Sequence, residues 1–483
     1  MIKSIRVALV VASAILVLPA LASADYPPPG NPGVPTPRPG GAATLKVCKK
    51  GCKYKTIQAG VNAAQSGDIV RIGTGTYKEQ VTIEGHSKDA IQLVGNIADP
   101  HKVFIDAKLK PNGVIINTAN RVELHGISTH GYLANGFFAV HAEDYVMDNL
   151  IATGTGVYGL YAFDSKGGEM KNSDAYYNTD AGFYIGQTPF QISPKRTFVT
   201  NIKSWGNVLG WSGTNMRYVT IRKSKFFNNG TGLVPNALTS EKYPPEEDNL
   251  ITDNDVMWNN FNYYKSGPFT ATPGTSGIPY PIGVGILLFG GRRQTVSNNR
   301  IYGNWITGMG LITQIAMAAD ATNPNNKCAT TSILLNPDCS ITKSEPIGLT
   351  GDWKADKPWE LANNTISGNV FGNGRNDLNA RDLAYDGTGH GNCFSGNTLT
   401  AAVNLPVVSL VAFPDCVDAP GEAVNTRNRD AGGEAVGWAL GVKKSKGMLI
   451  HPTTSLGKLK PFPQCKLSAV CGSLWNKKIK APR

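Results

Sequence analysis

Several features that mark common protein classes are scarce in this sequence. Charged residues make up only 17% of the 483 residues, and the seven histidines are scattered along the chain. After residue 24, no stretch approaches the ~20 consecutive apolar residues that a membrane-spanning helix needs. Helical periodicity is clear only near residues 56–65 (TIQAGVNAAQ). We therefore expect no transmembrane segment in the mature chain, and a metal-handling protein is a poor fit.

The first 43 residues have the composition of a targeting segment followed by a linker. Lys3 and Arg6 precede an apolar run, and residues 22–24 (ASA) place small side chains at a cleavage position. This is the pattern of a secretory signal peptide over residues 1–24. Residues 25–43 (DYPPPGNPGVPTPRPGGAA) form a Pro/Gly-rich linker that we expect to be extended and without a core. A secreted or periplasmic location follows.

The cysteines favour disulfides, because an exported chain with an even number of them usually pairs them. The eight fall into neighbouring pairs: Cys48/Cys52, Cys328/Cys339, Cys393/Cys416 and Cys465/Cys471. Eight cysteines allow 105 pairings, and pairing between neighbours is the simplest. The competing interpretation is a zinc site, but no histidine stands at ligand spacing. We expect neither a metal nor another cofactor.

The chain carries an excess of positive charge. Its formal net charge is +12, or +10 (12 − 2) once Lys3 and Arg6 leave with the signal peptide. A basic exported protein can meet an acidic polysaccharide, an anionic lipid or a cell wall. The alternative is a solvated basic surface, helped by the C-terminal KKIKAPR. The net charge thus limits the classes of binding partner without identifying one of them. We expect the protein to be a monomer and not to bind nucleic acid.

Glycines open a similar phrase every 23 residues in the middle of the chain. The evenly spaced phrases begin at Gly113 (GVIIN), Gly136 (GFFAV), Gly159 (GLYAF) and Gly182 (GFYIG). Asparagines six residues apart recur in the same units, for example Asn172 with Asn178 and Asn201 with Asn207. Between them apolar and polar residues alternate, as in YVTIRKSKF, which is the period of a β-strand.

A short unit with three strands and sharp turns is one coil of a parallel β-helix, in which coils stack at ~4.8 Å. Equivalent asparagines then form a ladder between coils, and the opening glycine suits a turn with unusual dihedral angles. A β-propeller needs blades of ~40 residues or more, and the leucine-rich-repeat signature is absent. The sequence predicts an all-β, parallel β-helix over residues 44–400 with an N-terminal helical cap and long loop insertions. Residues 401–483 are expected to be a C-terminal cap and basic tail.

The chain resembles the right-handed parallel β-helix proteins of the pectin lyase-like superfamily. GDIVRIGTGTYKEQVTI (67–83) is similar to the start of pectin methylesterases and related carbohydrate-active enzymes. Later coils, such as SGTNMRYVTIRKSKFFNNGTGLVPN, resemble bacterial secreted proteins with copper-binding-periplasmic and alginate-epimerase-type repeats. The resemblance covers residues 44–400 and implies a right-handed solenoid. The paired-aspartate pattern of the methylesterases and the Asp-Pro-His-Asp signature of the epimerases are absent, so activity is not implied with the same specificity.

Alternation along each strand sorts its side chains between the core and the outside. The first and third positions after each glycine point inward: Val114 and Ile116, Phe137 and Ala139, Leu160 and Ala162, Phe183 and Ile185. The second positions point outward and carry Phe138, Tyr161 and Tyr184. This aromatic stripe suits stacking against sugar rings, or equally a cross-coil ladder that contributes ~0.2–1 kcal/mol per pair.

The fifth positions are polar: Thr118, His141, Asp164, Gln187 and Asn215. His141 and Asp164 are one coil apart, and a carboxylate beside an imidazole can make a general base. The alternative is a surface pair without a catalytic task. No cluster of acidic residues accompanies them, so a calcium-bridged site is a poor fit.

Long insertions are expected to wall this face, because loops on a rigid scaffold often carry function. They are residues 237–249, 263–281 and 313–361. Their cationic and aromatic side chains, with those that follow, are Lys242, Tyr243, Tyr264, Arg292 and Arg293. Each of these singly is more often a solvated loop residue than a ligand contact.

These observations predict a secreted protein that binds an acidic polysaccharide or cell-wall glycan, with a lyase or epimerase reaction as the chemistry to test. The candidate catalytic residues are His141, Asp164 and Tyr161. The candidate substrate-binding residues are Phe138, Tyr184, Gln187, Asn215, Lys242 and Arg292. The alternative is a non-catalytic cell-surface or envelope module that binds carbohydrate or is purely structural.

Overall fold

The computed structural model describes the chain between residues 28 and 416, with gaps. The described ranges are 28–106, 110–238, 241–261, 263, 280–304, 306–312, 361–373, 378–379, 381–385, 389–400, 413, 415 and 416. Several predictions fall outside them: the signal peptide, Tyr264, most of the insertions 263–281 and 313–361, nearly all of residues 401–483, and Cys328, Cys339, Cys465 and Cys471.

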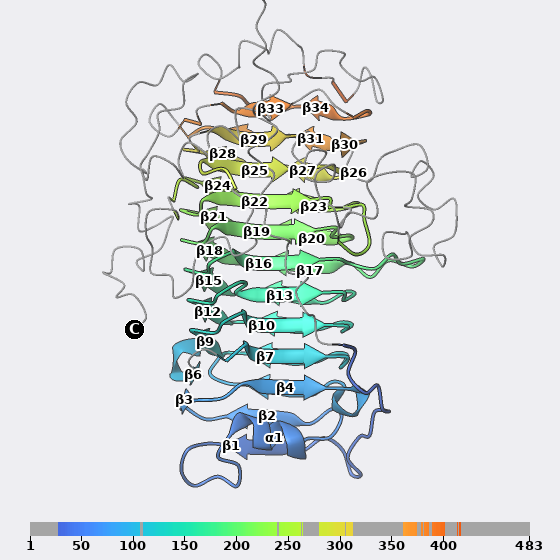
Figure 1. Ribbon diagram of the computed structural model, residues 1–483, viewed down its shortest axis with the longest axis vertical. Coiled ribbons are helices and arrows are strands. Elements are labelled where there is room, and N and C mark those ends of the chain that lie inside the picture. Colours follow the sequence, from blue (N-terminus) through green and yellow to red (C-terminus); the bar gives the residue numbers. More distant parts are fainter. Residues whose placement is uncertain are drawn as a thin grey trace, which may run out of the picture.

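The protein is a right-handed parallel β-helix, as the sequence predicts. Figure 1 shows its coils stacked in one column from β1 to β34. Neighbouring coils pair in parallel in three sheets. Within one coil the chain passes from the second sheet to the first and then to the third, as in β7, β8 and β9.

The strand bounds show how regular the coils are. The first sheet has 12 strands, in the order β1 (Thr44–Val47), β2 (Ile69–Ile72), β5 (Gln92–Val94), β8 (Glu123–His125), β11 (Val146–Asp148), β14 (Glu169–Lys171), β17 (Thr197–Thr200), β20 (Val219–Arg222), β23 (Leu250–Thr252), β27 (Thr295–Ser297), β31 (Thr365–Ser367) and β34 (Cys393–Ser395). The second has 10 strands: β4 (Val81–Glu84), β7 (Asn112–Asn117), β10 (Asn135–Val140), β13 (Leu160–Phe163), β16 (Ala181–Gly186), β19 (Leu209–Thr214), β22 (Thr231–Asn236), β25 (Val284–Leu288), β29 (Thr307–Leu311) and β33 (Leu383–Tyr385).

The third sheet also has 10 strands: β3 (Gly75–Tyr77), β6 (Val103–Ile105), β9 (Ser128–His130), β12 (Ile151–Thr153), β15 (Asp174–Tyr176), β18 (Lys203–Trp205), β21 (Lys225–Phe227), β24 (Asp255–Met257), β28 (Arg300–Tyr302) and β32 (Val370–Phe371). A short pair joins β26 (Gly291–Arg292) to β30 (Leu361–Ala362). Two 3₁₀ turns complete the described elements, η2 (His86–Lys88) and η3 (Pro100–Lys102).

The N-terminal end carries the helix α1 (Ile57–Ala63), which packs against β1, β2 and β4. The Thr56 hydroxyl accepts from the N–H of Ala59 (3.1 Å), and the Glu79 carboxylate accepts from the N–H groups of Ile57 and Gln58 (2.9 Å each). These oxygens satisfy donors that a helix leaves free at its start. The helix lies where the sequence predicts it, and its role as the cap of the solenoid stays a prediction.

The core confirms the predicted alternation. The inward positions of the second sheet, from Val114 to Ile185, are at most 3% exposed and belong to one apolar cluster that runs through the solenoid. Complete burial of a Leu, Ile or Phe side chain is worth about 1.5–3 kcal/mol. The repeated inward residues therefore account for much of the stability of each coil.

The glycines that open the repeated phrases are needed for a different physical reason from the one expected. Gly159, Gly182 and Gly210 do not have positive φ angles. A Cβ on Gly159 would lie 2.5 Å from the carbonyl oxygen of Gly182, and one on Gly210 would lie 2.5 Å from the carbonyl oxygen of Gly232. The column of glycines is therefore required by the close approach of consecutive coils, and the expectation of unusual dihedral angles at these positions is wrong.

The asparagine ladder is confirmed, in more than one column. In the longest, each side-chain amide donates to the side-chain oxygen of the asparagine on the next coil at 3.0–3.3 Å, and the column runs Asn178, Asn207, Asn229, Asn259, Asn304 and Asn379. A second runs Asn254, Asn299, Asn369 and Asn397. Because these amides are buried, the ladders satisfy polar groups that would otherwise cost stability.

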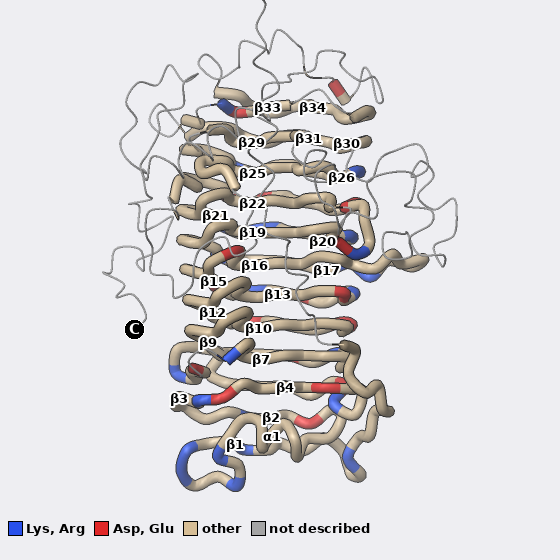
Figure 2. Tube along the Cα trace, viewed as in Figure 1, with Lys and Arg blue, Asp and Glu red and all other residues tan. Residues whose placement is uncertain are grey.

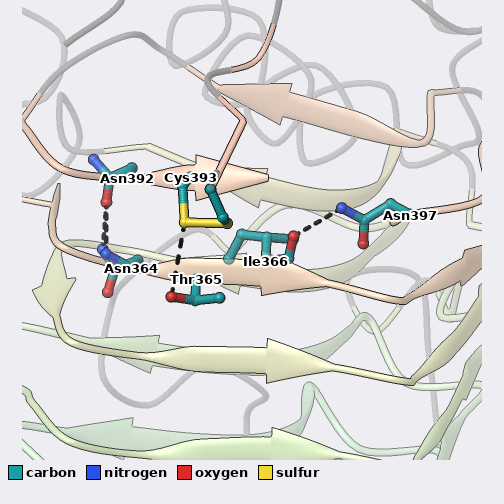
Figure 3. Close-up of a disulfide and its surroundings, with 7 residues drawn as sticks. Asn364, Thr365, Ile366, Asn392, Cys393 and Asn397 are labelled. Carbon is teal, nitrogen blue, oxygen red and sulfur yellow. Dashed lines mark hydrogen bonds between the residues drawn. A yellow bond between two sulfur atoms is a disulfide. The ribbon is translucent and has the colours of Figure 1, made fainter. Parts of the chain in front are cut away.

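Two of the predicted disulfides lie in the described chain, and both pair neighbours as expected. Cys48 is bonded to Cys52 and Cys393 to Cys416. Figure 3 shows the second of these beside the asparagine column in which Asn364 donates to Asn392 (2.8 Å). The disulfide thus fastens residue 416 to the last described coil.

Candidate functional site

Five polar side chains stand in a column where the strands of the second sheet end and the chain turns toward the first. We call them the corner column: Thr118, His141, Asp164, Gln187 and Asn215. All five have left-handed φ values, between 45° and 59°, a region that residues other than glycine adopt uncommonly. The same corner is therefore repeated on successive coils, and neighbouring side chains are ~4.8 Å apart along the solenoid.

The carboxylate of Asp164 is the point on which the candidate catalytic groups converge. Its Oδ2 lies 3.5 Å from Nδ1 of His141 on the preceding coil, and 3.4 Å from both Nζ of Lys242 and the hydroxyl of Tyr243. The side chains of His141 and Asp164 are 17% and 11% exposed, and that of Lys242 is 50% exposed. The structure thus brings together the predicted His141–Asp164 pair and the predicted loop residues Lys242 and Tyr243 at one place that solvent reaches.

The long loop after β22, which carries Lys242, is held by the corner column itself. Asn215 donates to the carbonyl oxygens of Leu238 (2.8 Å) and Lys242 (2.9 Å) and accepts from the N–H of Leu238 (2.9 Å). Gln187 accepts from the N–H of Lys242 (3.1 Å) and donates to the Glu241 carboxyl group (2.5 Å). Gln187 and Asn215 are buried. They therefore support the loop, and the expectation that they face a substrate is wrong.

The two ends of the corner column are covered by other parts of the chain. Thr118 accepts a hydrogen bond from the N–H of Gly30 (2.8 Å), so the segment before β1 lies over one end. The loop after β22 covers the other end. His141 and Asp164 lie between these covers on two consecutive coils, with side chains 17% and 11% exposed. We call this partly exposed place, at whose edge Lys242 and Tyr243 reach Asp164, the window.

A buried cluster of charges anchors the far side of the same loop. Glu247 accepts from Nε of Arg217 (2.8 Å), Nε of Arg292 (2.9 Å) and Nη2 of Arg293 (2.6 Å). Burial acts to raise the pKa of Glu247, but the three arginine charges outweigh it and lower this pKa to about 2. Arg292 is only 2% exposed. Its predicted role as an exposed substrate contact is therefore wrong, because its guanidinium is committed to Glu247.

The pKa of Glu246, next to this cluster, is shifted in the opposite direction from that of Glu247. Its side chain is fully buried, and its Oε1 faces Nδ2 of Asn249 at 3.4 Å. Burial raises the pKa of Glu246 well above its usual range. Burial therefore acts against the charged form of Glu246, whereas the arginine charges favour the charged form of its neighbour Glu247.

The prediction of an exposed aromatic stripe on the outer face is wrong in one respect, which is the exposure of its side chains. Phe138, Tyr161 and Tyr184 stand in register on consecutive strands, but they are only 3%, 2% and 4% exposed. The rings of Phe138 and Tyr161 stack at 4.5 Å, those of Tyr161 and Tyr184 meet edge to face at 4.8 Å, and Tyr158 packs on both tyrosines. Because the coil spacing matches the distance at which rings stack, the aromatics bury one another. They form a packed cluster in place of an open platform for sugar.

The open part of the site can support acid–base chemistry. Asp164 can orient the His141 ring, and an imidazole oriented in this way can accept a proton. Burial raises the pKa of Tyr243 to about 12, with the Asp164 charge adding to the shift, so this hydroxyl is a proton donor at neutral pH. Lys242 adds a half-exposed positive charge. Within the described residues, no group of three or more His, Cys, Asp and Glu side chains is placed to hold a metal ion.

Sequence reasoning missed the partners that lie far apart in the chain. Glu247 and Arg217 were not singled out, although the acidic run EKYPPEED and the pair Arg292-Arg293 are visible in the sequence. Opposite charges in the insertion 237–249 and in the later pair Arg292-Arg293 are the signal that could have suggested an ion pair. Nothing in the sequence indicates that Gly30 bonds to Thr118.

Among known proteins, the chain is similar to several solved structures. No protein-family model and no curated protein sequence matches the chain. Among solved structures, the chain is similar to the A-module of the mannuronan C-5 epimerase AlgE6 of Azotobacter vinelandii, with 17% identity, 72% of this chain and 91% of that chain covered, and a TM-score of 0.42. It is also similar to a rhamnogalacturonan lyase, with 16% identity, 54% of this chain and 76% of that chain covered, and a TM-score of 0.41. A third similar structure is the alginate lyase from Paenibacillus sp. str. FPU-7, with 14% identity, 75% of this chain and 97% of that chain covered, and a TM-score of 0.37.

The helices of the described chain are all too short or too polar to span a bilayer. The two observed disulfides suit a chain that folds in an oxidising compartment. With its three parallel sheets, its glycine column and its asparagine ladders, the chain is a right-handed parallel β-helix.

Proposed function

We propose that this protein is a secreted or periplasmic monomer that binds an acidic polysaccharide in the window at His141 and Asp164 and modifies one uronate unit there. The single observation that carries the proposal is the convergence of His141, Lys242 and Tyr243 on the Asp164 carboxylate. An imidazole, an ammonium group and a protonated phenol around one carboxylate supply a base, a charge and an acid.

The reaction class that uses these three groups begins with removal of the proton next to a carboxylate. Neutral His141 accepts the C5 proton of the uronate, and Asp164 stabilises the imidazolium that forms. Lys242 offsets the negative charge that develops on the uronate carboxylate. Tyr243 then gives its proton either to the opposite face of C5, which is epimerisation, or to the departing O4, which is β-elimination.

The test is to incubate the full mature chain with a panel of polyuronates that includes alginate blocks and polygalacturonate. Ultraviolet absorbance detects the unsaturated ends that a lyase leaves, and deuterium uptake at C5 in heavy water detects an epimerase. Turnover should fall at least ~10²-fold in Asp164→Asn and in His141→Gln, because general acid–base catalysis contributes about that much.

Matched controls separate chemistry from folding. Asp253 also has a left-handed φ, of 57°, and is exposed, but it lies at the corner between the first sheet and the third. Asp253→Asn therefore makes the same change away from the site and should keep full activity. His101 is exposed as well, and His101→Gln is the control for His141→Gln. Binding without any product on the whole panel would refute the catalytic step and favour a carbohydrate-binding module. Absence of both binding and product would refute the proposal.

A further inference from the structure

The N-terminal end of the solenoid carries a concentration of positive charge that the corner site does not use. Five lysines fall within ten residues, KVCKKGCKYK, and all five are exposed: Lys46, Lys49, Lys50, Lys53 and Lys55. The chain contains no Asp or Glu between Asp25 and Asp68. Figure 2 shows the resulting group of basic residues at the loop beside β1.

This loop is held in one conformation. The Cys48–Cys52 disulfide closes it, and the N–H of Cys48 donates to the carbonyl oxygen of Tyr54 (3.1 Å). The ammonium group of Lys49 lies 4.2 Å from the centre of the Tyr77 ring. A loop fixed in this way loses little conformational entropy when it binds a partner.

The acidic groups near the loop are already engaged elsewhere. Asp68 pairs with Arg38 (2.6 Å), and Glu79 accepts from the N–H groups at the start of α1. Within the described chain, no salt bridge involves any of the five lysines. Lys46 also stands in register with the exposed Arg71 on the next strand. The positive potential of this end is therefore not neutralised by the protein, and it attracts polyanions.

An open hollow of about 420 Å³ lies against the same loop. Lys46, Lys53 and Tyr54 line it, and Tyr54 is partly exposed. The ammonium group of Lys53 lies 5.3 Å from the centre of the Tyr54 ring. A hollow lined by an aromatic ring and two lysines suits a ligand with both flat apolar faces and negative charges. A sugar ring with a carboxylate has both.

We infer that the loop of residues 46–55 is a second polyanion-binding surface, and that its ligand is an acidic polysaccharide. The lysines pair with carboxylates, and Tyr54 packs on a sugar ring. The surface is four strands of the first sheet away from the level of His141, about 20 Å at ~4.8 Å per strand, so it holds the polymer apart from the corner site. A membrane is a poorer occupant, because peripheral membrane segments add apolar anchors to their charges and Val47 of this loop is buried.

The test compares two triple variants that remove the same charge from different places. Lys49→Gln/Lys50→Gln/Lys53→Gln removes three lysines of the loop. The control, Lys102→Gln/Lys203→Gln/Lys223→Gln, removes three exposed lysines from other coils. Binding of each full chain to immobilised polygalacturonate is measured at low and physiological salt, with uncharged dextran as the blank and thermal melting as the check on folding.

We expect the loop variant to bind at least ~10-fold more weakly and with a flatter salt dependence, while the control stays within ~2-fold of wild type. Tyr54→Ala should weaken binding to polygalacturonate but not to inorganic polyphosphate, which has no ring to stack. An equal loss in both triple variants, no loss in the loop variant, or stronger retention on phosphatidylglycerol vesicles than on polygalacturonate overturns the inference. The loop variant should keep wild-type turnover of a short oligouronate that occupies the corner site alone, so failure of the corner site and failure of the loop give different results.

Discussion

Replacement of Glu247 by glutamine tests how firmly the site loop is held. The change keeps the size of the side chain but removes the charge that faces Arg217, Arg292 and Arg293 within 2.9 Å. Folding lowers the pKa of Glu247 from 4.5 to about 2. At about 1.36 kcal/mol per pKa unit, this shift adds about 3 kcal/mol to the free energy of unfolding. Removing one partner of a buried ion pair costs about 3–5 kcal/mol by mutational experience. Both estimates describe the same interaction, so we expect Glu247→Gln to lower the free energy of unfolding by about 3–5 kcal/mol at pH 7.

The loss should depend on pH in a defined direction. A carboxyl group whose pKa is lowered by folding stabilises the protein fully above its unfolded pKa and stops doing so as the pH falls through its folded pKa. The difference between wild type and Glu247→Gln should therefore be full above about pH 5 and shrink between about pH 4.5 and pH 2. Urea denaturation at pH 7 and pH 3 measures the difference, and the rate of trypsin cleavage after Lys242 reports loosening of the loop itself.

The neighbouring Glu246→Gln substitution is a matched control with the opposite expected sign. Burial raises the pKa of Glu246, so its carboxyl group lowers stability as the pH rises above the unfolded pKa. Glutamine resembles the neutral form and removes that dependence, so we expect Glu246→Gln to gain stability relative to wild type as the pH rises above the unfolded pKa, with the gain already present at pH 7. If Glu247→Gln were as stable as wild type at pH 7, or if both variants lost equally, the electrostatic account of the loop would be refuted.

Three further predictions concern the site and the coils. Tyr243→Phe should lower polyuronate turnover by at least ~10²-fold, and the loss should be constant from pH 5 to pH 10 in a pH–rate profile, because a pKa of about 12 keeps the hydroxyl protonated throughout. Gly210→Ala places a Cβ 2.5 Å from the carbonyl oxygen of Gly232, and urea denaturation should show a loss of about 1–3 kcal/mol. Asn207→Ala leaves buried ladder amides without partners at a cost of about 1–3 kcal/mol each, and hydrogen exchange should rise in the adjoining coils while distant coils keep their protection.

The fold could be predicted because its signals are local and repeated. Leu160 and Ala162 alternate with Tyr161 within one strand, and the same phrase returns 23 residues later with Gly182. Each recurrence is an independent indication of the same coil, so errors at one position do not change the conclusion. The reason for the glycines was missed because it depends on the distance between two backbones, and sequence alone does not contain that distance.

The burial of the aromatic stripe could not be predicted from alternation. Alternation predicts the side of the strand on which Phe138, Tyr161 and Tyr184 lie, and this prediction is correct. Exposure depends instead on what packs against that side, and here Tyr158, which precedes the strand, lies across two of the rings. An outward position in a solenoid is therefore not the same as an exposed one.

The corner column shows why only part of the site could be read from the sequence. Its five residues share one backbone conformation and one kind of polarity, so nothing local separates His141 and Asp164 from the rest. What separates them is the chain that covers the other three: Gly30 bonds to Thr118, 88 positions later, and Lys242 bonds to Gln187 across 55 positions. Covering segments from two distant parts of the chain leave one window, and the groups suited to acid–base chemistry lie in it. The sequence therefore shows what chemistry each coil could offer, while long-range contacts decide which coil is left open to offer it.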